Sequence, residues 1–352
     1  MTADKGDLFL QTQLLPVTPE NIALAGELIR AGQLVAFPTE TVYGLGANAL
    51  DADAVSRIFA AKGRPGDNPL IAHISALEQL RPLIAVEPGE IATRMMDAFW
   101  PGPLTMIFPR SDKVPMAVTA GLDTVAVRFP AHPAARALID AAGCPIAAPS
   151  ANRSGRPSPT TARHVLEDMD GRVPLILDGG PCDVGLESTV VDMTGPEPRI
   201  LRPGGVTREM IAAVAGTASV DPAVMRPLKE GETARSPGMK YRHYAPAGQL
   251  TIVSGARAIE VICRLYDDAL AEGHNPLILA LSGHMDACGG RRVRSLGADA
   301  SGMAHEIFAR LREADDLDAD VIFSEAVSTD GVGLAVMNRL GRAAAFHVIE
   351  AE

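Results

Sequence analysis

The chain has 352 residues, of which 47% are hydrophobic and 21% charged, and these proportions are those of an ordinary globular protein with a sizeable core. The formal net charge of −11 disfavours broad, sequence-independent binding to nucleic acid, because such binding depends on Lys and Arg side chains that neutralise phosphates. The composition also excludes a disordered, fibrous or repetitive chain.

The first 215 residues alternate short apolar runs, expected to be strands, with amphipathic segments, expected to be helices. The expected strands are Gln33–Pro38, Pro69–Ile74, Leu104–Phe108, Thr124–Phe129, Pro145–Ala148, Leu175–Leu177, Thr189–Met193 and Arg199–Leu201. The expected helices are Pro19–Ala31, Ala52–Lys62, Pro88–Trp100, Pro133–Ala142, Thr161–Met169 and Arg208–Ala215. This alternation predicts an α/β domain with a largely buried, partly parallel sheet.

Residues 216–249 lose this periodicity, because Pro and Gly interrupt them repeatedly, and we expect a linker there. A second α/β pattern follows. Its expected strands and helices are Leu250–Val253, Ala256–Leu270, Pro276–Leu281, Gly302–Glu313, Val321–Glu325, Leu334–Ala344 and Ala345–Ile349. The sequence therefore predicts a domain at 1–215, a linker at 216–249 and a small doubly wound domain at 250–352.

The four Cys residues lie far apart and form no CxxC pair, so we expect reduced thiols and no Cys-type zinc site. The first 20 residues have no apolar run of signal-peptide length, and no segment approaches the roughly 20 apolar residues of a membrane span. The expected protein is soluble and cytoplasmic.

Polar side chains follow several of the expected strands. PTETVYGLGANAL, at 38–50, places Thr and Glu side chains before two Gly residues, which suits either a small polar ligand or an ordinary turn. In AKGRPGDNPLIAHI, at 61–74, Lys62 and Arg64 flank a Gly, which fits a polyphosphate clamp or a solvated basic turn. His73 in this stretch is, by itself, an ordinary structural histidine.

Three later stretches carry the same kind of side chain. In DTVAVRFP, at 123–130, Arg128 interrupts an apolar strand and needs either an acidic side chain or an anionic ligand as its partner. APSANRSGRPSPTT, at 148–161, gathers hydroxyls and cations before a helix, which suits anion binding or a surface loop. LESTVVDM and RILRPGG, at 186–193 and 199–205, place Ser188 and Arg202 at strand ends.

Together these stretches predict a site at the edge of the sheet where the strands end, since ligands of open α/β sheets bind there. The cations and hydroxyls indicate a polar, anionic ligand with several phosphate-like charges. The chain contains no GxxxxGK[ST] phosphate loop, HExxH motif or GxSxG elbow, so any nucleotide must be held in another way.

Taken together and in this order, the stretches resemble those of the YrdC/Sua5 family, which are L-threonylcarbamoyladenylate synthases. SPGMKYRHYAP, at 236–246, and GLAVMNRLGRAA, at 333–344, resemble the long Sua5 form. The resemblance implies a YrdC-like twisted mixed α/β sheet with helices and an open cleft, followed by a smaller Rossmann-like α/β domain of the Sua5 type.

The resemblance also implies a reaction: L-threonine, bicarbonate and ATP give threonylcarbamoyl-AMP and pyrophosphate, with Mg²⁺ bridging the phosphates. The adenylate would serve the threonylcarbamoyl modification of adenosine 37 in tRNAs that read ANN codons. Separate transferase proteins would carry the group to tRNA. Neither a metal site built from protein side chains, nor stable nucleic-acid binding, nor membrane association is expected.

Residue roles follow from the same resemblance. The threonine site would be formed by Thr41, His73, Arg128, Ser150 and Ser188. ATP would be held by Lys62, Arg64, Asn68, Thr124, Asn152, Thr160, Arg202, His243 and Tyr244, with Ser158 and Thr161 as alternatives to Thr160. Lys62 and Arg64 would be the catalytic cations. Residues 236–246 are expected to fold over the cleft as a lid.

Other classes of protein compete with this interpretation. An RNA-binding module would use the same cations as an RNA cleft, but the net charge of −11 counts against it. A carbamoyl transferase of the hydrogenase-maturation type would share a related domain, yet such proteins carry CxxC pairs that this chain lacks. A scaffold without chemistry is disfavoured by the density of polar groups after the strands.

Overall fold

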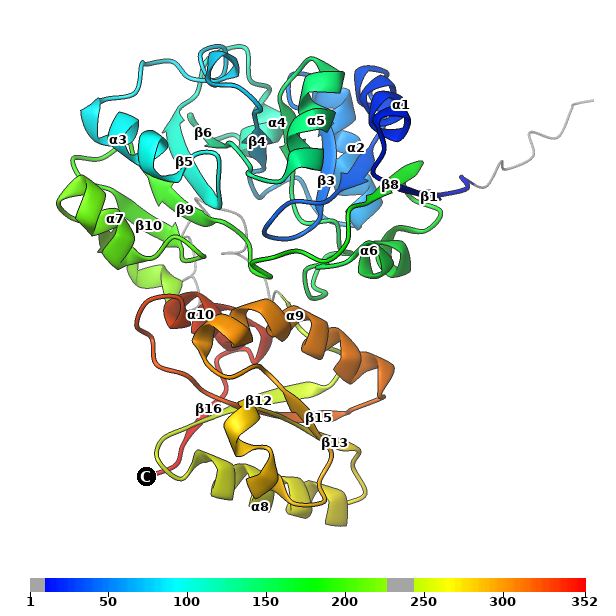
Figure 1. Cartoon of the computed structure of the whole chain (residues 1–352), viewed down its shortest axis with the longest axis vertical. Coiled ribbons are helices and arrows are strands. Elements are labelled where there is room, and N and C mark those ends of the chain that lie inside the picture. Colours follow the sequence, from blue (N-terminus) through cyan, green and yellow to red (C-terminus); the bar gives the residue numbers. More distant parts are fainter. Residues whose placement is uncertain (1–9, 227–243) are drawn as a thin grey trace, which may run out of the picture.

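A computed structural model describes residues 10–226 and 244–352, which form two α/β units stacked along the long axis (Figure 1). The larger unit contains an 11-stranded mixed sheet with the order β1-β8-β2-β3-β7-β4-β6-β5-β9-β10-β11. Its strands are β1 Gln13–Pro16, β2 Val35–Phe37, β3 Gly44–Asn48, β4 Ile71–His73, β5 Leu104–Pro109, β6 Thr124–Arg128, β7 Ile146–Ala148, β8 Leu175–Asp178, β9 Thr189–Asp192, β10 Arg199–Arg202 and β11 Ser219–Val220.

Seven α-helices of the larger unit are described, and they cover the two faces of its sheet unequally. They are α1 Pro19–Arg30, α2 Ala52–Lys62, α3 Glu90–Phe99, α4 Met116–Thr119, α5 Pro133–Ala142, α6 Ala162–Met169 and α7 Arg208–Ala215. The helices α2, α3, α4, α6 and α7 bury their apolar sides in one continuous core. On the other face α1 and α5 pack over β2, β7 and β8. The same face of β4, β6, β5, β9 and β10 carries a smaller apolar cluster that includes Ile71, Ala126 and Val190, to which none of the described α-helices contributes.

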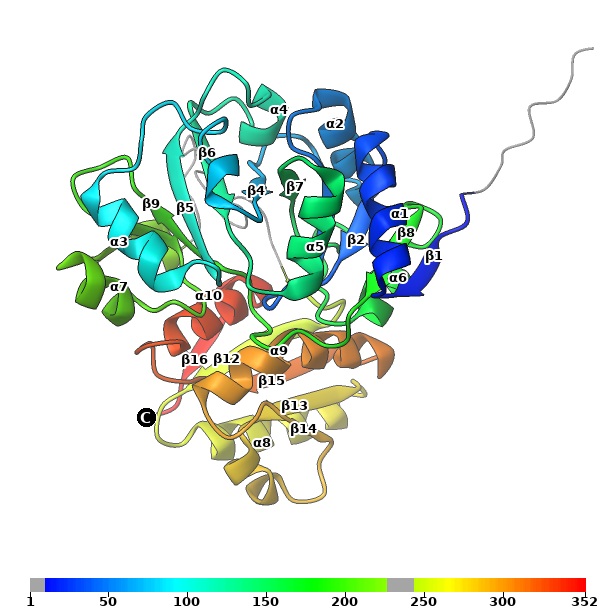
Figure 2. The same cartoon turned by 45° about the horizontal axis from the view of Figure 1, so that its top comes forward.

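The smaller unit is a parallel five-stranded sheet with the order β14-β13-β15-β12-β16. Its strands are β12 Gln249–Ser254, β13 Pro276–Ala280, β14 Val293–Ser295, β15 Val321–Glu325 and β16 Val348–Glu350. The helix α8 Ala258–Ala271 covers the face that is turned away from the larger unit, whereas α9 Ala300–Asp316 and α10 Gly333–Ala343 lie between the sheet and that unit (Figures 1 and 2). The expected α/β fold, a mixed sheet followed by a Rossmann-like domain, is confirmed.

Local sequence signals explain where the helix that precedes the basic turn begins and ends. The side chain of Asp51 accepts hydrogen bonds from the backbone of Asp53 and Ala54 and so caps α2, as its position predicts. Gly63 ends the helix at φ +63°, a left-handed conformation that glycine adopts at little cost. Lys62 therefore occupies the last turn and is buried, two residues before Arg64.

Several elements differ from the sequence-based expectation. The sequence predicts a Gly-rich turn where the structure has β3, and it does not predict β1, α4, β11 or β14. The expected strand Ala345–Ile349 begins only at Val348, because Ala345 and Phe346 have positive φ and form a turn after α10. Residues 219–220, within the expected linker, add β11 to the large sheet. The large sheet therefore extends beyond residue 215.

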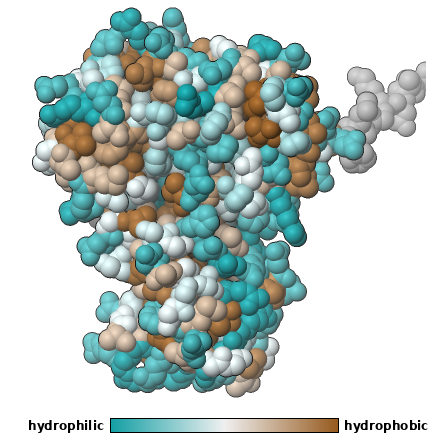
Figure 3. Space-filling view, in the orientation of Figure 1, coloured by the Kyte–Doolittle hydropathy of each residue, from teal (hydrophilic) through white to brown (hydrophobic). Residues whose placement is uncertain are grey.

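Hydrophilic residues cover much of the face shown in Figure 3, and its hydrophobic residues are dispersed in small groups. No helix in residues 10–226 and 244–352 is long and apolar enough to span a membrane. All four cysteines are free thiols, and three of them are buried.

Candidate active site

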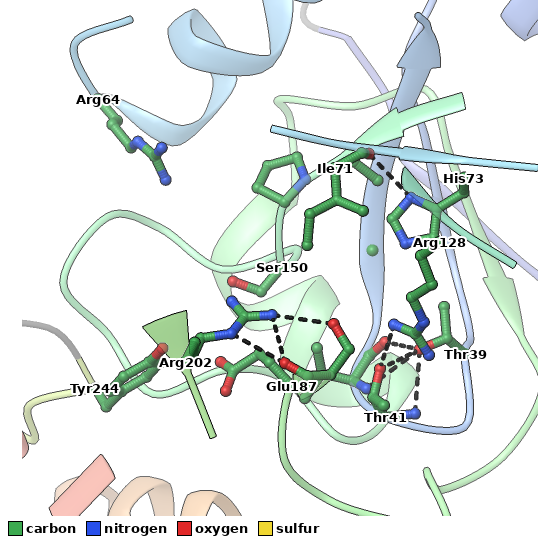
Figure 4. Close-up of a pocket in the computed structure, with 15 residues that line it drawn as sticks. Thr39, Thr41, Arg64, Ile71, His73, Arg128, Ser150, Glu187, Arg202 and Tyr244 are labelled. Atoms are coloured by element: carbon green, nitrogen blue, oxygen red, sulfur yellow. Dashed lines mark hydrogen bonds between the residues drawn. The ribbon is translucent and has the colours of Figure 1, made fainter. Parts of the chain in front are cut away.

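A pocket of about 550 Å³, counted with its open mouth, lies over the part of the sheet that α1 and α5 leave uncovered. It is lined by Thr39, Thr41, Val42, Gly44, Arg64, Ile71, His73, Arg128, Ala148, Pro149, Ser150, Glu187, Ser188, Arg202 and Tyr244. Figure 4 shows how the polar members point into one space from separate segments of the chain. Eight of the predicted site residues are therefore brought together: Thr41, Arg64, His73, Arg128, Ser150, Ser188, Arg202 and Tyr244.

The strand register corrects the expectation that these groups meet at one edge of the sheet. The strand β7 runs antiparallel to β4 and pairs Ala148 with Ile71 and Ile146 with His73. Ser150, which follows β7, thus lies beside the start of β4, whereas His73 lies at its end. Because Ile71 and His73 are two residues apart, they share one face of β4. The pocket therefore lies on a face of the sheet, and loops from both ends of the strands enclose it.

Arg128 is buried at the end of β6 and is already paired within the protein. Its Nη2 lies 2.7 Å from Glu40 Oε1, and its Nη1 donates to Thr41 Oγ1 at 2.8 Å. Burial would raise the pKa of Glu40, but the charge of Arg128 holds it below its usual value. Glu40 thus supplies the acidic partner that the sequence left open as one of two. The cost of burying Arg128 is met by Glu40, so it does not by itself require a ligand.

His73 presents a neutral imidazole to the pocket. Its Nδ1 lies 3.1 Å from the Ile71 carbonyl oxygen and 3.3 Å from that of Ile146. Because both neighbours are acceptors, Nδ1 carries the hydrogen, and Nε2 is left as an acceptor. Burial, and then the charge of Arg128, lower the pKa of His73 to about 3. The ring is therefore a hydrogen-bond acceptor at neutral pH, suited to a ligand hydroxyl or N–H.

The depressed pKa of His73 predicts an acid-dependent loss of stability. Between the ordinary pKa of 6.5 and the folded value of about 3, the unfolded chain holds a proton on His73 that the folded chain lacks. We expect the free energy of unfolding of the parent chain, minus that of His73→Gln, to fall by about 1.4 kcal/mol for each pH unit below 6.5. Urea unfolding of both proteins at pH 7.5, 6.0 and 5.0 measures this difference. A constant difference would show that His73 takes up its proton as readily in the folded chain as in the unfolded chain.

Lys62 holds the loop that follows β7. Its Nζ donates to the carbonyl oxygens of Ser150 and Asn152, the latter at 2.7 Å, and lies 3.4 Å from Asn152 Oδ1. Ser150 Oγ in turn donates to Asn152 Oδ1 at 2.5 Å. Burial, and then the charge of Arg64, lower the pKa of Lys62. Lys62 and Asn152 therefore hold in place the loop that carries Ser150 into the pocket wall, although neither of them lines the pocket.

Two arginines enter the pocket from different sides (Figure 4). Arg64 Nη2 donates to the Asn68 carbonyl oxygen at 3.0 Å, and its guanidinium lies 5.8 Å from the centre of the Phe59 ring. Arg202 donates from Nε and Nη2 to the Ser188 carbonyl oxygen, at 3.1 and 3.0 Å, and from Nη2 to Ser188 Oγ at 3.1 Å. Burial lowers the pKa of Arg202 to about 10, so it is cationic at neutral pH. Both cations suit an anionic ligand.

Three further predicted nucleotide-binding residues, besides Lys62 and Asn152, lie outside the pocket. Asn68 is fully buried, and neither polar atom of its side chain has a hydrogen-bond partner in the structure. Thr124 begins β6, and it shares a face of that strand with Ala126 and Arg128, about 13 Å from the latter at 3.3 Å per residue. Thr160 is buried, and its backbone and hydroxyl approach His164 Nδ1 at 3.3 and 3.4 Å. A buried amide without a partner, such as that of Asn68, can be satisfied by a ligand or by an ordered water.

Two family profiles match the chain. Residues 27–204 match the Sua5/YciO/YrdC profile, described as "Telomere recombination", and residues 206–345 match the C-terminal domain of threonylcarbamoyl-AMP synthase. A threonylcarbamoyl-AMP synthase of Pyrococcus abyssi is 50% identical over 333 residues, which are 94% of this chain and 95% of that protein. The chain belongs to the Sua5/YciO/YrdC family.

Further members of the family resemble the chain over nearly its whole length. A threonylcarbamoyl-AMP synthase of Bacillus subtilis is 47% identical and covers 96% of this chain and 97% of its own. The crystal structure of Sua5 from P. abyssi complexed with L-threonine superposes with a TM-score of 0.90 at 46% identity, over 97% of this chain and 99% of that one. The family resemblance inferred from the sequence is thus confirmed, in its long Sua5 form.

The predicted lid of this Sua5-family chain can be placed only in part. His243 and the rest of 236–243 lie outside the described residues. Tyr244 is buried at φ +66°, with its ring centre 5.1 Å from that of Phe308 in α9 and 5.6 Å from the Arg339 guanidinium of α10. In Figure 4 the hydroxyl end of Tyr244 faces the pocket. Tyr244 therefore connects the small domain to the pocket wall.

Sequence reasoning missed two acidic residues of the site, Glu40 and Glu187. Both stand within the stretches that were singled out, at PTET and LEST, but no role was assigned to them. Glu187 Oε1 accepts a hydrogen bond from Ser158 Oγ at 2.5 Å, and Oε2 accepts one from Arg339 Nε at 2.8 Å. No group of three or more His, Cys, Asp or Glu side chains that could hold a metal ion occurs among the described residues.

Proposed function

We propose that this chain is a threonylcarbamoyl-AMP synthase, which converts L-threonine, bicarbonate and ATP into threonylcarbamoyl-AMP and pyrophosphate. The observation that carries the proposal is the pocket: it gathers a neutral imidazole, the hydroxyls of Thr and Ser side chains, and Arg128 together with the cations Arg64 and Arg202. Two long relatives of this chain bear the synthase name, and one solved relative is complexed with L-threonine. The product would supply the threonylcarbamoyl modification of tRNA, completed by separate transferase proteins.

The threonine would lie against the floor formed by His73, Arg128 and Thr41. Arg128 Nη1 donates one N–H to Thr41, and Nη2 forms an ion pair with Glu40 without a hydrogen bond to any described residue, so N–H groups of both terminal nitrogens remain for the threonine carboxylate. His73 Nε2 would accept the hydrogen of the threonine hydroxyl. Ser150 and Ser188 would contact the amino acid from the opposite walls, since both line the pocket.

ATP would lie beside the threonine, with its phosphates between Arg64 and Arg202. The adenosine part would extend along the face of β6 toward Thr124, near the unpartnered amide of Asn68. Thr160, Asn152 and Lys62 would support the nucleotide through the loop after β7. His243, which lies outside the described residues, and Tyr244 remain proposed contacts. Mg²⁺ would arrive on the phosphates of ATP, because this ion commonly binds through phosphates and few protein ligands.

Two bond-forming steps give the product. The amine of threonine attacks the carbon of bicarbonate, and loss of water leaves an N-carboxylated threonine, a carbamate. A carbamate oxygen then attacks the α-phosphorus, and the bond from that phosphorus to the bridging oxygen breaks, so pyrophosphate leaves with the electron pair. In-line placement and neutralised phosphate charge favour this step more than a strong base does. The Arg-rich, base-poor pocket supports that assignment.

The test is release of pyrophosphate from ATP when threonine and bicarbonate are omitted in turn. We expect release only with all three reactants, and threonylcarbamoyl-AMP in equal amount by mass spectrometry. Release that ignores threonine would contradict the proposal. Tight binding of tRNA that needs no threonine and weakens steeply with salt would instead favour an RNA-binding module. Because ATP and tRNA meet in the cytoplasm, we propose that location for the protein.

A further inference from the structure

The helices α9 and α10 of the small domain face the active-site unit (Figures 1 and 2). Both carry buried arginines whose partners lie in that unit, among them Arg312 and Arg339. Arg312 of α9 is 2% exposed, and its Nη2 donates to the Pro157 carbonyl oxygen and to Asp168 Oδ2, at 2.6 and 2.7 Å. Arg339 of α10 is fully buried. Burying an arginine is costly unless it is paired, so these two side chains point to specific partners across the domain boundary.

The partners of Arg339 belong to the pocket or adjoin it. Its Nε donates to Glu187 Oε2 at 2.8 Å, and its Nη2 donates to the carbonyl oxygen of Pro203, which directly follows Arg202. Its Nη1 donates to Asn338 Oδ1 at 2.6 Å. The other oxygen of Glu187 accepts the Ser158 hydroxyl at 2.5 Å. The carboxylate of Glu187 is thus held on both sides, and its cationic partner comes from the small domain.

A second cation lies close to the same carboxylate. Glu187 and Arg202 both line the pocket, on either side of Ser188, and Figure 4 shows the carboxylate beneath the Arg202 guanidinium. Burial would raise the pKa of Glu187, but attraction to Arg339, and then to Arg202, lowers it to about 2. Arg202 nevertheless donates to Ser188 alone among the described residues, at 3.0–3.1 Å. Without Arg339, Arg202 would be the cation next to a buried, unpaired carboxylate.

We infer that Arg339 is a positioning residue of the active site: by pairing with Glu187 it keeps that carboxylate from Arg202, and so leaves Arg202 free to bind the anionic part of the substrate. This inference rests on the proposed function, in which Arg202 contacts the phosphates of ATP. It gives the small domain a chemical role in the reaction of the large one. A purely mechanical contact would need no buried charge aimed at a carboxylate of the pocket.

The experiment compares four variants of the full chain: Arg339→Met, Arg339→Lys, Glu187→Gln with Arg339→Met, and Arg202→Met. KM for ATP and for threonine, and kcat, are measured by pyrophosphate release. We expect Arg339→Met to raise KM for ATP at least about 10-fold, in the range of one charged contact. The double variant should return to within about threefold of the parent chain, because the free carboxylate is gone. Arg339→Lys, which keeps the charge, should also stay near the parent value.

Arg312→Met is the matched control, because it removes a buried arginine of the same domain boundary that pairs with Asp168 instead. Adding Glu187→Gln to Arg312→Met should restore nothing.

If the Arg339→Met and double variants are equally impaired, Arg339 is only a structural contact and the inference is wrong. Should Arg339→Met fail to fold, an Arg339→Lys chain with KM for ATP as high as that of Arg202→Met overturns the inference. An unchanged KM for ATP in Arg202→Met would instead refute the nucleotide assignment of Arg202, and loss of threonine dependence in the parent chain would refute the proposed function.

Discussion

Replacing Arg64 by Met is expected to lower kcat/KM for ATP by about 100- to 1000-fold, which is the usual effect of removing one preorganised donor from a developing charge. Arg64 lies at the pocket, and the turn that Gly63 makes after α2 fixes its position. Met has an apolar side chain that can pack on the Phe59 ring, over which the Arg64 guanidinium lies, but it removes the planar donors that fit phosphate oxygens. The measurement is steady-state pyrophosphate release with ATP varied at saturating threonine.

Arg153→Met is the control for this prediction, because Arg153 is an exposed cation on the loop after β7 and does not line the pocket. It should change kcat/KM for ATP by less than about threefold, since exposed charges act weakly through solvent. A fall in kcat/KM that is equal in both variants would show that general positive charge attracts ATP and that Arg64 makes no specific contact. Thermal unfolding of both variants checks that each is folded.

The fold could be predicted in outline because most elements carry a local signal. The strand β3 could not be predicted, since GLGAN resembles a loop. Its glycines are required by side chains of neighbouring strands, which the sequence alone does not place beside them. A Cβ on Gly46 would lie 2.8 Å from Ile146 Cγ2 and 2.9 Å from Phe37 Cε1, closer than side chains can approach. Glycine is therefore required in a strand that pairs with β2 and β7 on both sides.

The site could be predicted residue by residue where polar groups follow strands, but their partners could not. The pairings of Arg128 with Glu40 and of Arg339 with Glu187 join residues 88 and 152 positions apart, and no periodicity indicates such a pair. The contacts between the domains could not be predicted for the same reason. In the sequence, Arg339 is indistinguishable from any other arginine of an amphipathic helix. Tertiary packing alone shows that it faces a pocket carboxylate.

Replacing Arg128 by Gln is expected to raise KM for threonine about 100-fold or more while changing KM for ATP by less than about threefold, because the charged contact to the threonine carboxylate is lost. The same change should cost about 3–5 kcal/mol of stability, since it leaves the buried Glu40 carboxylate without its cation. The two effects have different causes, so a second substitution separates them. Steady-state kinetics and urea unfolding are measured on the same preparations.

The double variant Glu40→Gln with Arg128→Gln removes both buried charges and should recover most of the lost stability, because two amides can still hydrogen-bond to one another. It should not recover threonine affinity, since no cation is restored. A double variant that regains both would mean that Arg128 serves threonine only by keeping the pocket folded. Equal losses of affinity for ATP and threonine in Arg128→Gln would mean that its ligand is not the amino acid. The Arg128–Glu40 pair is thus expected to hold the fork of Arg128 in place, while the N–H groups that it leaves unshared bind the substrate.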